Sequence, residues 1–367
     1  MGKKVKKIKV LIAAGGTGGH VFPGIAIAEE MARCDPSVEI CFAGTRRGLE
    51  ADLVPKHGWP VVMLASHSIK DRKGLAKIGA AMLVPFSVLG AMKILISRRP
   101  SVLVSIGGYA AGPLCLAAWM LRVPITLVEP NAIPGMTNRL LSRFAKRVFV
   151  SFDEAVPSFG SKAALTGTPV RQRILDARHG QRTDPNKITI FVFGGSQGAR
   201  RLNDGIVAAL SGLAALKGRL TFIHQTGAND DSAVIGRAYR DAGVTARVFP
   251  FTDRMWECYE GADIVVARSG ANTVAEVAAL GLPSILVPYP YAADDHQRAN
   301  AQALVRAGGA VMIDNGDFTG DRIAGEIASM VSDQRKLETM RKGALGFGRP
   351  DAARTIAREC LAMAEDE

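Results

Sequence analysis

Short apolar runs alternate with segments of mixed polarity along the chain. Residues 8–14 are apolar and rich in β-branched side chains, which predicts a buried strand, and residues 25–32 have the composition of a helix. The same order returns at residues 188–193, an apolar run that precedes a predicted helix at residues 200–213. Strands that alternate with helices in this way favour a doubly wound α/β fold.

Other apolar runs of strand length fit the same pattern. They lie at residues 38–42, 61–64, 102–105, 125–128, 147–150, 220–224, 247–249, 264–267 and 284–287. A chain of 367 residues is longer than one ordinary core, so two domains are expected, joined near residues 166–171 and 180–187. We predict two doubly wound α/β domains that face each other across a cleft. Open parallel sheets bind ligands beyond the carboxyl ends of their strands.

Glycine-rich turns follow the first strand of each predicted domain. They read Gly15-Gly16-Thr17-Gly18-Gly19-His20 and Gly194-Gly195-Ser196-Gln197-Gly198-Ala199. A glycine turn at a helix N-terminus offers backbone N–H groups and the positive end of the helix dipole, so phosphate is the natural ligand. Neither turn matches the dinucleotide fingerprint or the P-loop. Glycines used only for tight strand–helix packing remain the alternative for each turn.

Residues 267–276 combine a strand end, a turn of small residues and a helix start. A phosphate at that helix start would leave Glu276 able to accept hydrogen bonds from a ribose diol. Thr273 and Glu276 also have the spacing of a capping box, and local sequence does not separate the two interpretations. His20 has two interpretations as well: it takes a proton from an attacking hydroxyl, or it only orients a phosphate.

Charge is divided unevenly along the chain. Residues 1–150 hold 21 Lys and Arg against 8 Asp and Glu, whereas residues 151–367 hold 25 against 26. The basic excess therefore belongs to the N-terminal part and indicates an anionic partner there. A nucleic acid is a poor candidate, since the chain has no recognised RNA-binding signature and few aromatic residues.

An apolar segment lies inside this basic part. Residues 78–92 are uncharged, but they are fewer than the roughly 20 that a spanning helix needs, and Pro85 interrupts them. Lysines and arginines flank the segment on both sides, which is typical of a surface that rests on anionic lipid headgroups. A buried core helix with a basic end fits the same pattern, so both interpretations stay open.

Metal-binding patterns are absent from the sequence. The five cysteines are widely spaced without a Cys-x-x-Cys pair, and no Asp-x-Asp motif occurs. We expect no metal ion and no cofactor.

In their order along the chain, these motifs resemble the signature series of the MurG family, the bacterial N-acetylglucosaminyltransferases that convert lipid I to lipid II. The resemblance covers nearly the whole chain. The stretches that carry it are residues 15–20, 107–109 with 112–113, 129–132, 166–171, 194–199 and 267–276. The chain departs from the family's usual pattern at Pro130, where Gln is common, and at Thr168, where Asn is common.

The resemblance implies a GT-B glycosyltransferase with two Rossmann-like domains. Residues 1–170 would bind the acceptor and an anionic membrane surface, and residues 171–349 would bind UDP-N-acetylglucosamine (UDP-GlcNAc). A last helix at 350–367 would pack back on the first domain. The enzyme would move GlcNAc with inversion to the 4-hydroxyl of MurNAc in lipid I, undecaprenyl-diphospho-MurNAc-pentapeptide. It would do so without a metal ion, as a peripheral protein on the cytoplasmic face of the inner membrane.

The resemblance also implies roles for individual residues. His20 and Glu129 are the candidates for the catalytic base. The acceptor-binding residues are Gly16, Tyr109 and Asn138. The residues implied for donor binding are Thr17, Gly18, Gly19, Asn131, Arg171, Ser196, Thr252, Ala271, Asn272, Thr273, Val274, Glu276 and Gln297. A UDP-GlcNAc 2-epimerase, an isomerase of the same fold, is the alternative, although it has no need of a basic, apolar N-terminal surface.

Overall fold

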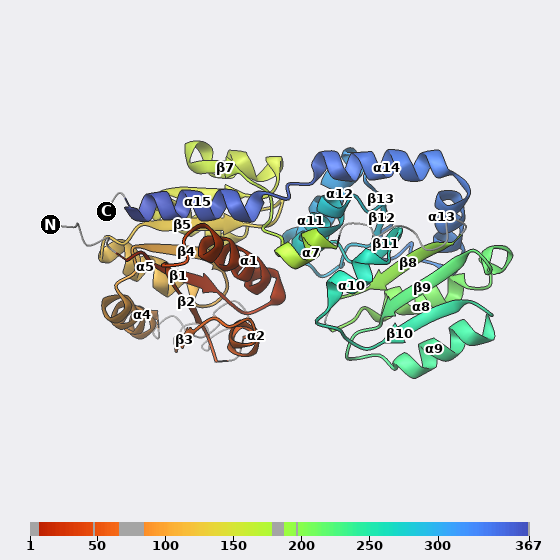
Figure 1. Ribbon diagram of the computed structural model, residues 1–367, viewed down its shortest axis with the longest axis horizontal. Helices are drawn as coiled ribbons and strands as arrows, with labels where there is room; N and C mark the ends of the chain where they lie inside the picture. The colour runs from red at the N-terminus through yellow and green to blue at the C-terminus, as the bar shows by residue number, and fades with distance from the viewer. Residues whose placement is uncertain (1–6, 47, 66–83, 178–186, 196, 366–367) are drawn as a thin grey trace. The chain divides into compact units, whose positions relative to one another are not determined.

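The computed structural model describes residues 7–46, 48–65, 84–177, 187–195 and 197–365. The chain divides into two compact units, one made of Met1–Arg171 with Pro350–Glu367 and the other of Gln172–Arg349. Each unit is built on one parallel sheet with helices on its faces (Figure 1). The chain therefore has the two doubly wound α/β domains that the sequence predicted.

The N-terminal unit contains a seven-stranded sheet in the order β3-β2-β1-β4-β5-β6-β7. Its strands are β1 (Lys9–Ala14), β2 (Glu39–Gly44), β3 (Val61–Met63), β4 (Val102–Gly107), β5 (Ile125–Glu129), β6 (Arg147–Val150) and β7 (Ala163–Leu165). Its helices are α1 (Gly18–Cys34), α2 (Glu50–Lys56), α4 (Val84–Arg98), α5 (Ala111–Met120), α6 (Met136–Leu141) and α15 (Ala352–Glu365), with short 3-10 turns η1 (Ser142–Phe144), η2 (Asp153–Ser158) and η3 (Gly160–Lys162).

Alternate side chains of β1 enter two different cores, as the two-residue period of a strand requires. Leu11 and Ala13 pack on the side of α4 and α5. Val10 and Ile12 pack on the side of α1 and α15. Both faces of the sheet are thus covered, which explains why its strands read as continuous apolar runs.

The C-terminal unit contains a six-stranded parallel sheet in the order β10-β9-β8-β11-β12-β13. Its strands are β8 (Ile188–Phe193), β9 (Leu220–Gln225), β10 (Thr245–Phe249), β11 (Ile264–Ala267), β12 (Ser284–Leu286) and β13 (Ala310–Met312). Its helices are α7 (Gln172–Asp176), α8 (Arg200–Ala209), α9 (Ser232–Asp241), α10 (Met255–Glu260), α11 (Ala271–Leu280), α12 (His296–Arg306), α13 (Gly320–Ser332) and α14 (Gln334–Phe347), with the turns η4 (Ala214–Leu216) and η5 (Ala293–Asp295).

The strands predicted from apolar runs are all present, with ends that differ by at most two residues. Two strands of three residues, β7 and β13, were not predicted. The helix predicted at residues 200–213 ends at Ala209, where a turn and a 3-10 segment follow. Helix α1 begins at Gly18, so Gly18, Gly19 and His20 form its first turn.

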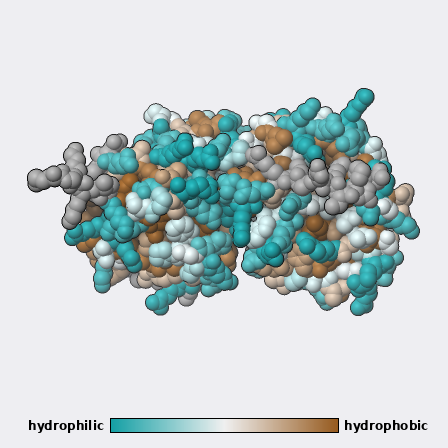
Figure 2. Space-filling view, in the orientation of Figure 1, coloured by the Kyte–Doolittle hydropathy of each residue, from teal (hydrophilic) through white to brown (hydrophobic). Residues whose placement is uncertain are grey.

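Helix α4 carries apolar side chains on two faces. Val88, Ala91 and Leu95 are buried against the sheet side, where α4 packs on α5. Phe86, Leu89 and Ile96 are exposed, by 70%, 62% and 58%. The space-filling view shows hydrophobic patches between hydrophilic residues on the visible face of both units (Figure 2). A core helix alone would not leave these side chains in water. Residues 78–83 of the predicted apolar segment lie outside the described residues.

No helix in the described part of the chain is long and apolar enough to cross a membrane.

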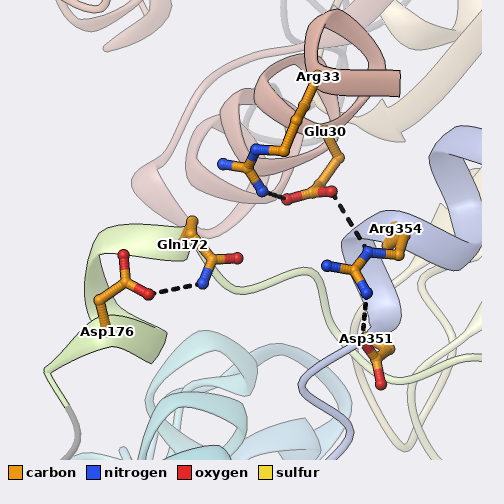
Figure 3. Close-up of polar contacts among 6 residues, drawn as sticks. All are labelled: Glu30, Arg33, Gln172, Asp176, Asp351 and Arg354. Atoms are coloured by element: carbon orange, nitrogen blue, oxygen red, sulfur yellow. Dashed lines mark hydrogen bonds and ion pairs between the residues drawn. The ribbon is translucent and has the colours of Figure 1, made fainter. Parts of the chain in front are cut away.

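Helix α15 lies along α1 in the N-terminal unit, although the two helices come from opposite ends of the chain (Figure 1). Glu30 of α1 is 5% exposed, and its carboxylate lies between the guanidinium groups of Arg33 and Arg354 (Figure 3). Arg354 also reaches Asp351, with 3.5 Å between Nη1 and Oδ1. These ion pairs and the apolar face of α15 hold the returning end of the chain on the first unit.

Candidate active site

The first glycine turn lies where the strand order of the N-terminal sheet reverses. β1 is flanked by β2 on one side and β4 on the other, so the turns after β1 and β4 meet at the carboxyl edge, where ligands bind in open α/β sheets. Gly16 has φ +91°, and it lies next to Tyr109: a Cβ on Gly16 would be 4.0 Å from Tyr109 Cε2. Gly108 also has φ +91°, and a Cβ on it would lie 2.3 Å from the carbonyl oxygen of Gly15. Side chains are excluded because two backbone turns touch each other here.

His20 lies against this pair of turns. Its Nδ1 is 3.2 Å from the carbonyl oxygen of Gly15 and 3.5 Å from Thr17 Oγ1. A carbonyl oxygen only accepts, so Nδ1 carries the proton in the neutral ring, and Nε2 carries the lone pair. The ring packs on Gly107, where a Cβ would lie 3.0 Å from Nε2. The geometry presents an imidazole whose tautomer is set by the backbone.

Glu129 ends β5 and is only 1% exposed. One carboxylate oxygen accepts from the N–H of Asn131 at 3.0 Å, and the other accepts from the N–H of Gly135 and from Asn138 Nδ2, both at 3.0 Å. Burial raises the pKa of this carboxyl, and the hydrogen bonds oppose that rise. Glu129 therefore holds the turn 130–135 together, with Asn131 and Asn138 as its partners.

The second glycine turn follows β8 at the reversal point of the C-terminal sheet, between β8 and β11. Gly195 and Gly198 have φ +95° and +83°. A Cβ on Gly198 would lie 2.3 Å from the carbonyl oxygen of Thr226, and one on Gly227 would lie 2.0 Å from Gly198 Cα. Gly227 has φ +89°, so two glycine turns again pack backbone to backbone. Ser196 of this turn lies outside the described residues.

A chain of hydrogen bonds between largely buried side chains supports the second glycine turn and the adjacent turn after β9. Asn203 Nδ2 donates to the carbonyl oxygen of Thr226 at 2.9 Å and to Asp230 Oδ2 at 2.7 Å. Asn203 Oδ1 therefore faces His224 Nε2 at 3.0 Å as an acceptor, so the proton of the ring is on Nε2. His224 Nδ1 then accepts from the hydroxyl of Tyr239 at 3.0 Å. Burial lowers the pKa of His224 to about 3, so this ring stays neutral.

Helix α11 begins at Ala271 with Gly270 as its N-cap, and that cap supplies no side-chain hydrogen bond. Thr273 lies inside the helix, so the capping-box interpretation is wrong. A cap at Thr273 would start the helix at residue 274, but the helix starts three residues earlier. Glu276 accepts instead from the hydroxyl of Tyr259, with 2.7 Å between that oxygen and Oε2. Asn272 and Thr273 are partly exposed in the first turn, and Val274 is buried.

Helices α1 and α8 also begin without a side-chain cap from the preceding residue, Thr17 and Ala199 respectively. By contrast, α9 begins at a capped end, where Asp231 accepts from the N–H groups of Ala233 and Val234. Three helices that follow strands at the reversal points thus present first turns without a side-chain acceptor from their N-cap residue. Such ends attract anions.

Of the remaining predicted residues, Arg171 and Thr252 lie in segments without regular structure, and Gln297 lies in the first turn of α12. Arg171 is 9% exposed and its guanidinium lies 4.4 Å from the ring centroid of Phe22 within the N-terminal unit. In the C-terminal unit, Thr252 Oγ1 accepts from the N–H of Arg254 at 3.0 Å. Gln297 Oε1 accepts from the N–H of Tyr289 at 3.0 Å.

Three residues that support the two glycine turns could not be identified from the sequence: Glu50, Asn203 and His224. Glu50 stands 34 positions from Gly16, and its contact depends on how α2 packs. Asn203 sits three residues into α8, a position where a polar residue is ordinarily assigned to the solvent face. No sequence pattern marks these residues. In the described part of the chain, no group of three or more His, Cys, Asp or Glu side chains is arranged to hold a metal ion.

Two Rossmann-like units with glycine turns at their reversal points have the architecture of the GT-B fold, to which glycosyltransferases belong. Family models agree: residues 10–150 match the glycosyltransferase family 28 N-terminal domain, and residues 189–356 match its C-terminal domain. A UDP-N-acetylglucosamine--N-acetylmuramyl-(pentapeptide) pyrophosphoryl-undecaprenol N-acetylglucosamine transferase of Myxococcus xanthus (strain DK1622) is 41% identical over 355 residues, covering 96% of this chain and 92% of the relative. A protein of the same name from Anaeromyxobacter sp. (strain Fw109-5) is 44% identical over 357 residues, covering 97% and 93%.

Solved structures give the same family. The crystal structure of Acinetobacter baumannii MurG matches with a TM-score of 0.79 at 28% identity, covering 97% of this chain and 99% of the other. A UDP-N-acetylglucosamine 2-epimerase matches with a TM-score of 0.68 at 13% identity, covering 99% and 98%, which indicates a shared fold alone. The chain belongs to the MurG family of glycosyltransferases.

Proposed function

We propose that this protein transfers GlcNAc from UDP-GlcNAc to the 4-hydroxyl of MurNAc in lipid I, with inversion to a β-1,4 linkage. The observation that carries this proposal is similarity along nearly the whole chain to transferases named for that reaction, at 41–44% identity in the relatives compared above. A likeness limited to the fold, such as that to the epimerase, would not single out one reaction.

The C-terminal unit is the proposed donor site. The start of α8, with Ser196 and its glycine turn, would bind the diphosphate, because first-turn N–H groups and the helix dipole favour a negative charge. Glu276 would accept hydrogen bonds from the ribose, held in place by Tyr259. The backbone near Thr252 would contact the uracil. Ala271–Val274 and Gln297 of the same unit would complete the site. The same N–H groups would stabilise the charge that develops on UDP in the transition state.

The N-terminal unit is the proposed acceptor site, with His20 as the base. In the reaction the MurNAc O4 forms a bond to the anomeric carbon while the bond from that carbon to the UDP oxygen breaks. The proton of the 4-hydroxyl passes to Nε2 of His20, the nitrogen that carries the lone pair. Glu129 is buried and holds the turn of Asn131 and Asn138, so its proposed part is to position the acceptor side beside Tyr109.

The N-terminal unit is proposed to bind an anionic membrane surface through α4 and α5, and its excess of basic residues would contribute to this binding. Phe86, Leu89, Lys93 and Ile96 recur at three- and four-residue spacing, so they share one face of α4, with an exposed lysine among exposed apolar side chains. Trp119 at the end of α5 is 53% exposed. Apolar side chains would enter the headgroup region while basic groups contact anionic lipid, at the cytoplasmic face of the membrane.

Acceptor-dependent transfer tests the proposed reaction. The protein is incubated with UDP-GlcNAc labelled in the sugar, with and without a lipid I analogue, and both UDP and the sugar products are followed. Release of UDP only in the presence of the analogue, with label in a β-1,4-linked disaccharide, is expected. Conversion of the label to an N-acetylmannosamine product without acceptor would assign the epimerase activity instead.

Sedimentation with vesicles tests the membrane surface. Binding to vesicles that contain anionic lipid should weaken with added salt, and Phe86→Ser with Leu89→Ser should abolish it while the melting temperature stays near that of the wild type. Leu345, another exposed leucine at 52%, lies in the C-terminal unit and serves as the control, since Leu345→Ser should leave vesicle binding intact. Equal binding by all variants would refute the assigned surface.

A further inference from the structure

The carboxylate of Glu50 is completely buried beside the first glycine turn. Its exposed fraction is 0%, and both oxygens accept hydrogen bonds from the backbone or from a neighbouring hydroxyl. Oε2 accepts from the N–H of Gly16 at 2.8 Å. Oε1 accepts from the N–H of Thr45 at 2.6 Å and from Thr45 Oγ1 at 3.1 Å. Burying a carboxylate costs free energy unless its lone pairs are satisfied, and here the donors belong to the ends of β1 and β2.

Three glycines leave room for this carboxyl group. A Cβ on Gly15, Gly44 or Gly48 would lie 2.5, 2.2 or 1.9 Å from an atom of the Glu50 side chain. A backbone hydrogen bond joins the same two segments, because the amide nitrogen of Leu49 donates to the carbonyl oxygen of Gly16 at 3.4 Å. The turn after β1 and the start of α2 are therefore built around one buried charge. Glycine is required at these three positions because any side chain there would overlap Glu50.

The peptide unit between Gly15 and Gly16 connects this charge to His20. Its N–H donates to Glu50 Oε2, and its carbonyl oxygen accepts from His20 Nδ1 at 3.2 Å. In a trans peptide the N–H and C=O point in opposite directions, so the carboxylate and the imidazole lie on opposite sides of the same peptide. Hydrogen bonds in series polarise one another, so the carboxylate strengthens the carbonyl as an acceptor.

We propose that Glu50 is a positioning residue that acts through the Gly15–Gly16 peptide to keep the proton of His20 on Nδ1 and the lone pair on Nε2. A carboxylate that orients a catalytic histidine through a direct hydrogen bond fixes the ring's tautomer in the same manner. Here one peptide unit stands between the two side chains. This role depends on the proposed function of His20 as the base. Gly108 has no side chain that would displace the Gly15 carbonyl oxygen from its position.

Glu50→Gln tests the relay with nearly the same shape. An amide presents one acceptor and one donor, so either Gly16 or Thr45 loses the acceptor of its N–H. We expect kcat for transfer to fall about 10- to 100-fold, the size typical when a supporting partner of a functional histidine is removed. The KM for UDP-GlcNAc should change less than kcat, because Glu276, the turn after β8 and the start of α11 belong to the other unit.

Glu30→Gln is the matched control. Glu30 is also a buried glutamate of the N-terminal unit, but its partners are Arg33 and Arg354 on α1 and α15. It should lower the melting temperature and leave kcat unchanged. Equal losses of kcat in Glu30→Gln and Glu50→Gln would overturn the positioning role in favour of general destabilisation.

The tautomer of His20 gives a readout that needs no substrate. Nitrogen-15 spectra of the histidine-labelled protein should show Nδ1 protonated and Nε2 unprotonated in the wild type, and a mixture of tautomers in Glu50→Gln. An unchanged tautomer with unchanged kcat would overturn the inference even if the wild type transfers GlcNAc. Absence of transfer by the wild type would instead remove the proposed function, and the spectra would still report on the relay.

Gly108→Ala perturbs the same peptide with Glu50 intact, and it decides the matter if Glu50→Gln does not fold. The new Cβ would meet the Gly15 carbonyl oxygen at 2.3 Å, at a backbone φ of +91°. Displacement of this oxygen should release His20 Nδ1 and lower kcat by a similar factor. Full kcat and an unchanged His20 spectrum in Gly108→Ala would contradict the relay.

Discussion

Acid should destabilise the C-terminal unit through one buried histidine. His224 is 0% exposed, and burial lowers its pKa from the ordinary 6.5 to about 3. Below pH 6.5 the unfolded chain binds a proton at this residue and the folded chain does not, so the free energy of unfolding falls. The stabilisation is complete above pH 6.5 and is lost progressively as the pH decreases toward about 3.

The magnitude follows from one proton per molecule. The free energy of unfolding should fall by about 1.4 kcal/mol for each pH unit within this window. At pH 5 the loss from His224 alone is therefore about 2 kcal/mol. His224→Gln removes the titration, because a glutamine amide can donate to Asn203 Oδ1 and accept from the hydroxyl of Tyr239 without binding a proton. The stability difference between wild type and variant should shrink by about 2 kcal/mol from pH 7.5 to pH 5.

The assay must follow the C-terminal unit alone, because two-unit proteins need not unfold in one step. The chain has three tryptophans, and Trp256 belongs to the C-terminal unit whereas Trp59 and Trp119 belong to the other. Urea unfolding followed by Trp256 fluorescence, in a Trp59→Phe, Trp119→Phe background, reports the relevant transition. A stability difference that stays constant between pH 7.5 and pH 5 would refute the neutral, buried state assigned to His224.

Three further predictions concern the proposed sites. Glu276→Ala should raise the KM for UDP-GlcNAc about tenfold with little change in kcat. Tyr259→Phe should raise this KM to a smaller extent, since it removes one hydrogen bond to the carboxylate and keeps the carboxylate itself. An unchanged KM in both variants, measured by steady-state kinetics, would contradict the ribose contact. Gly198→Ala should destabilise the C-terminal unit by about 1–3 kcal/mol. The new Cβ would lie 2.3 Å from the Thr226 carbonyl oxygen, and the backbone φ of +83° is unfavourable for alanine. A calorimetric transition identical to that of the wild type would argue against this packing. Glu129→Gln should raise the KM for the acceptor more than the KM for UDP-GlcNAc, because the substitution removes an acceptor for Gly135 and Asn138. The reverse pattern would move Glu129 to the donor side.

The regular elements could be predicted because buried parallel strands read as apolar runs. Residues 147–150, 188–193 and 264–267 were predicted with the bounds that the structure has. The capping box at Thr273 shows the limit of local sequence: a four-residue motif was present, but the helix begins where Gly270 ends the turn after β11. Helix ends depend on packing as well as on cap chemistry.

Sheet topology brings together the segments that follow neighbouring strands, so two candidate residues, His20 and Tyr109, were expected near the same edge of the sheet. In the structure His20 packs on Gly107, and Tyr109 lies on the side of Gly16. The partners behind them could not be predicted. Glu50 looks like an ordinary acidic residue in the first turn of a helix, and His224 looks like one polar residue in an apolar strand. Their hydrogen bonds arise from contacts between elements far apart in the sequence, which no short-range pattern contains.

Transfer of labelled GlcNAc into a lipid I analogue, with the mass and linkage of the product determined, is the decisive experiment for the proposed reaction. We expect one GlcNAc added in β-1,4 linkage to MurNAc and stoichiometric release of UDP. In His20→Ala, kcat should fall sharply while the KM for UDP-GlcNAc is retained. UDP release without a disaccharide product, or full kcat in His20→Ala, would contradict this proposal.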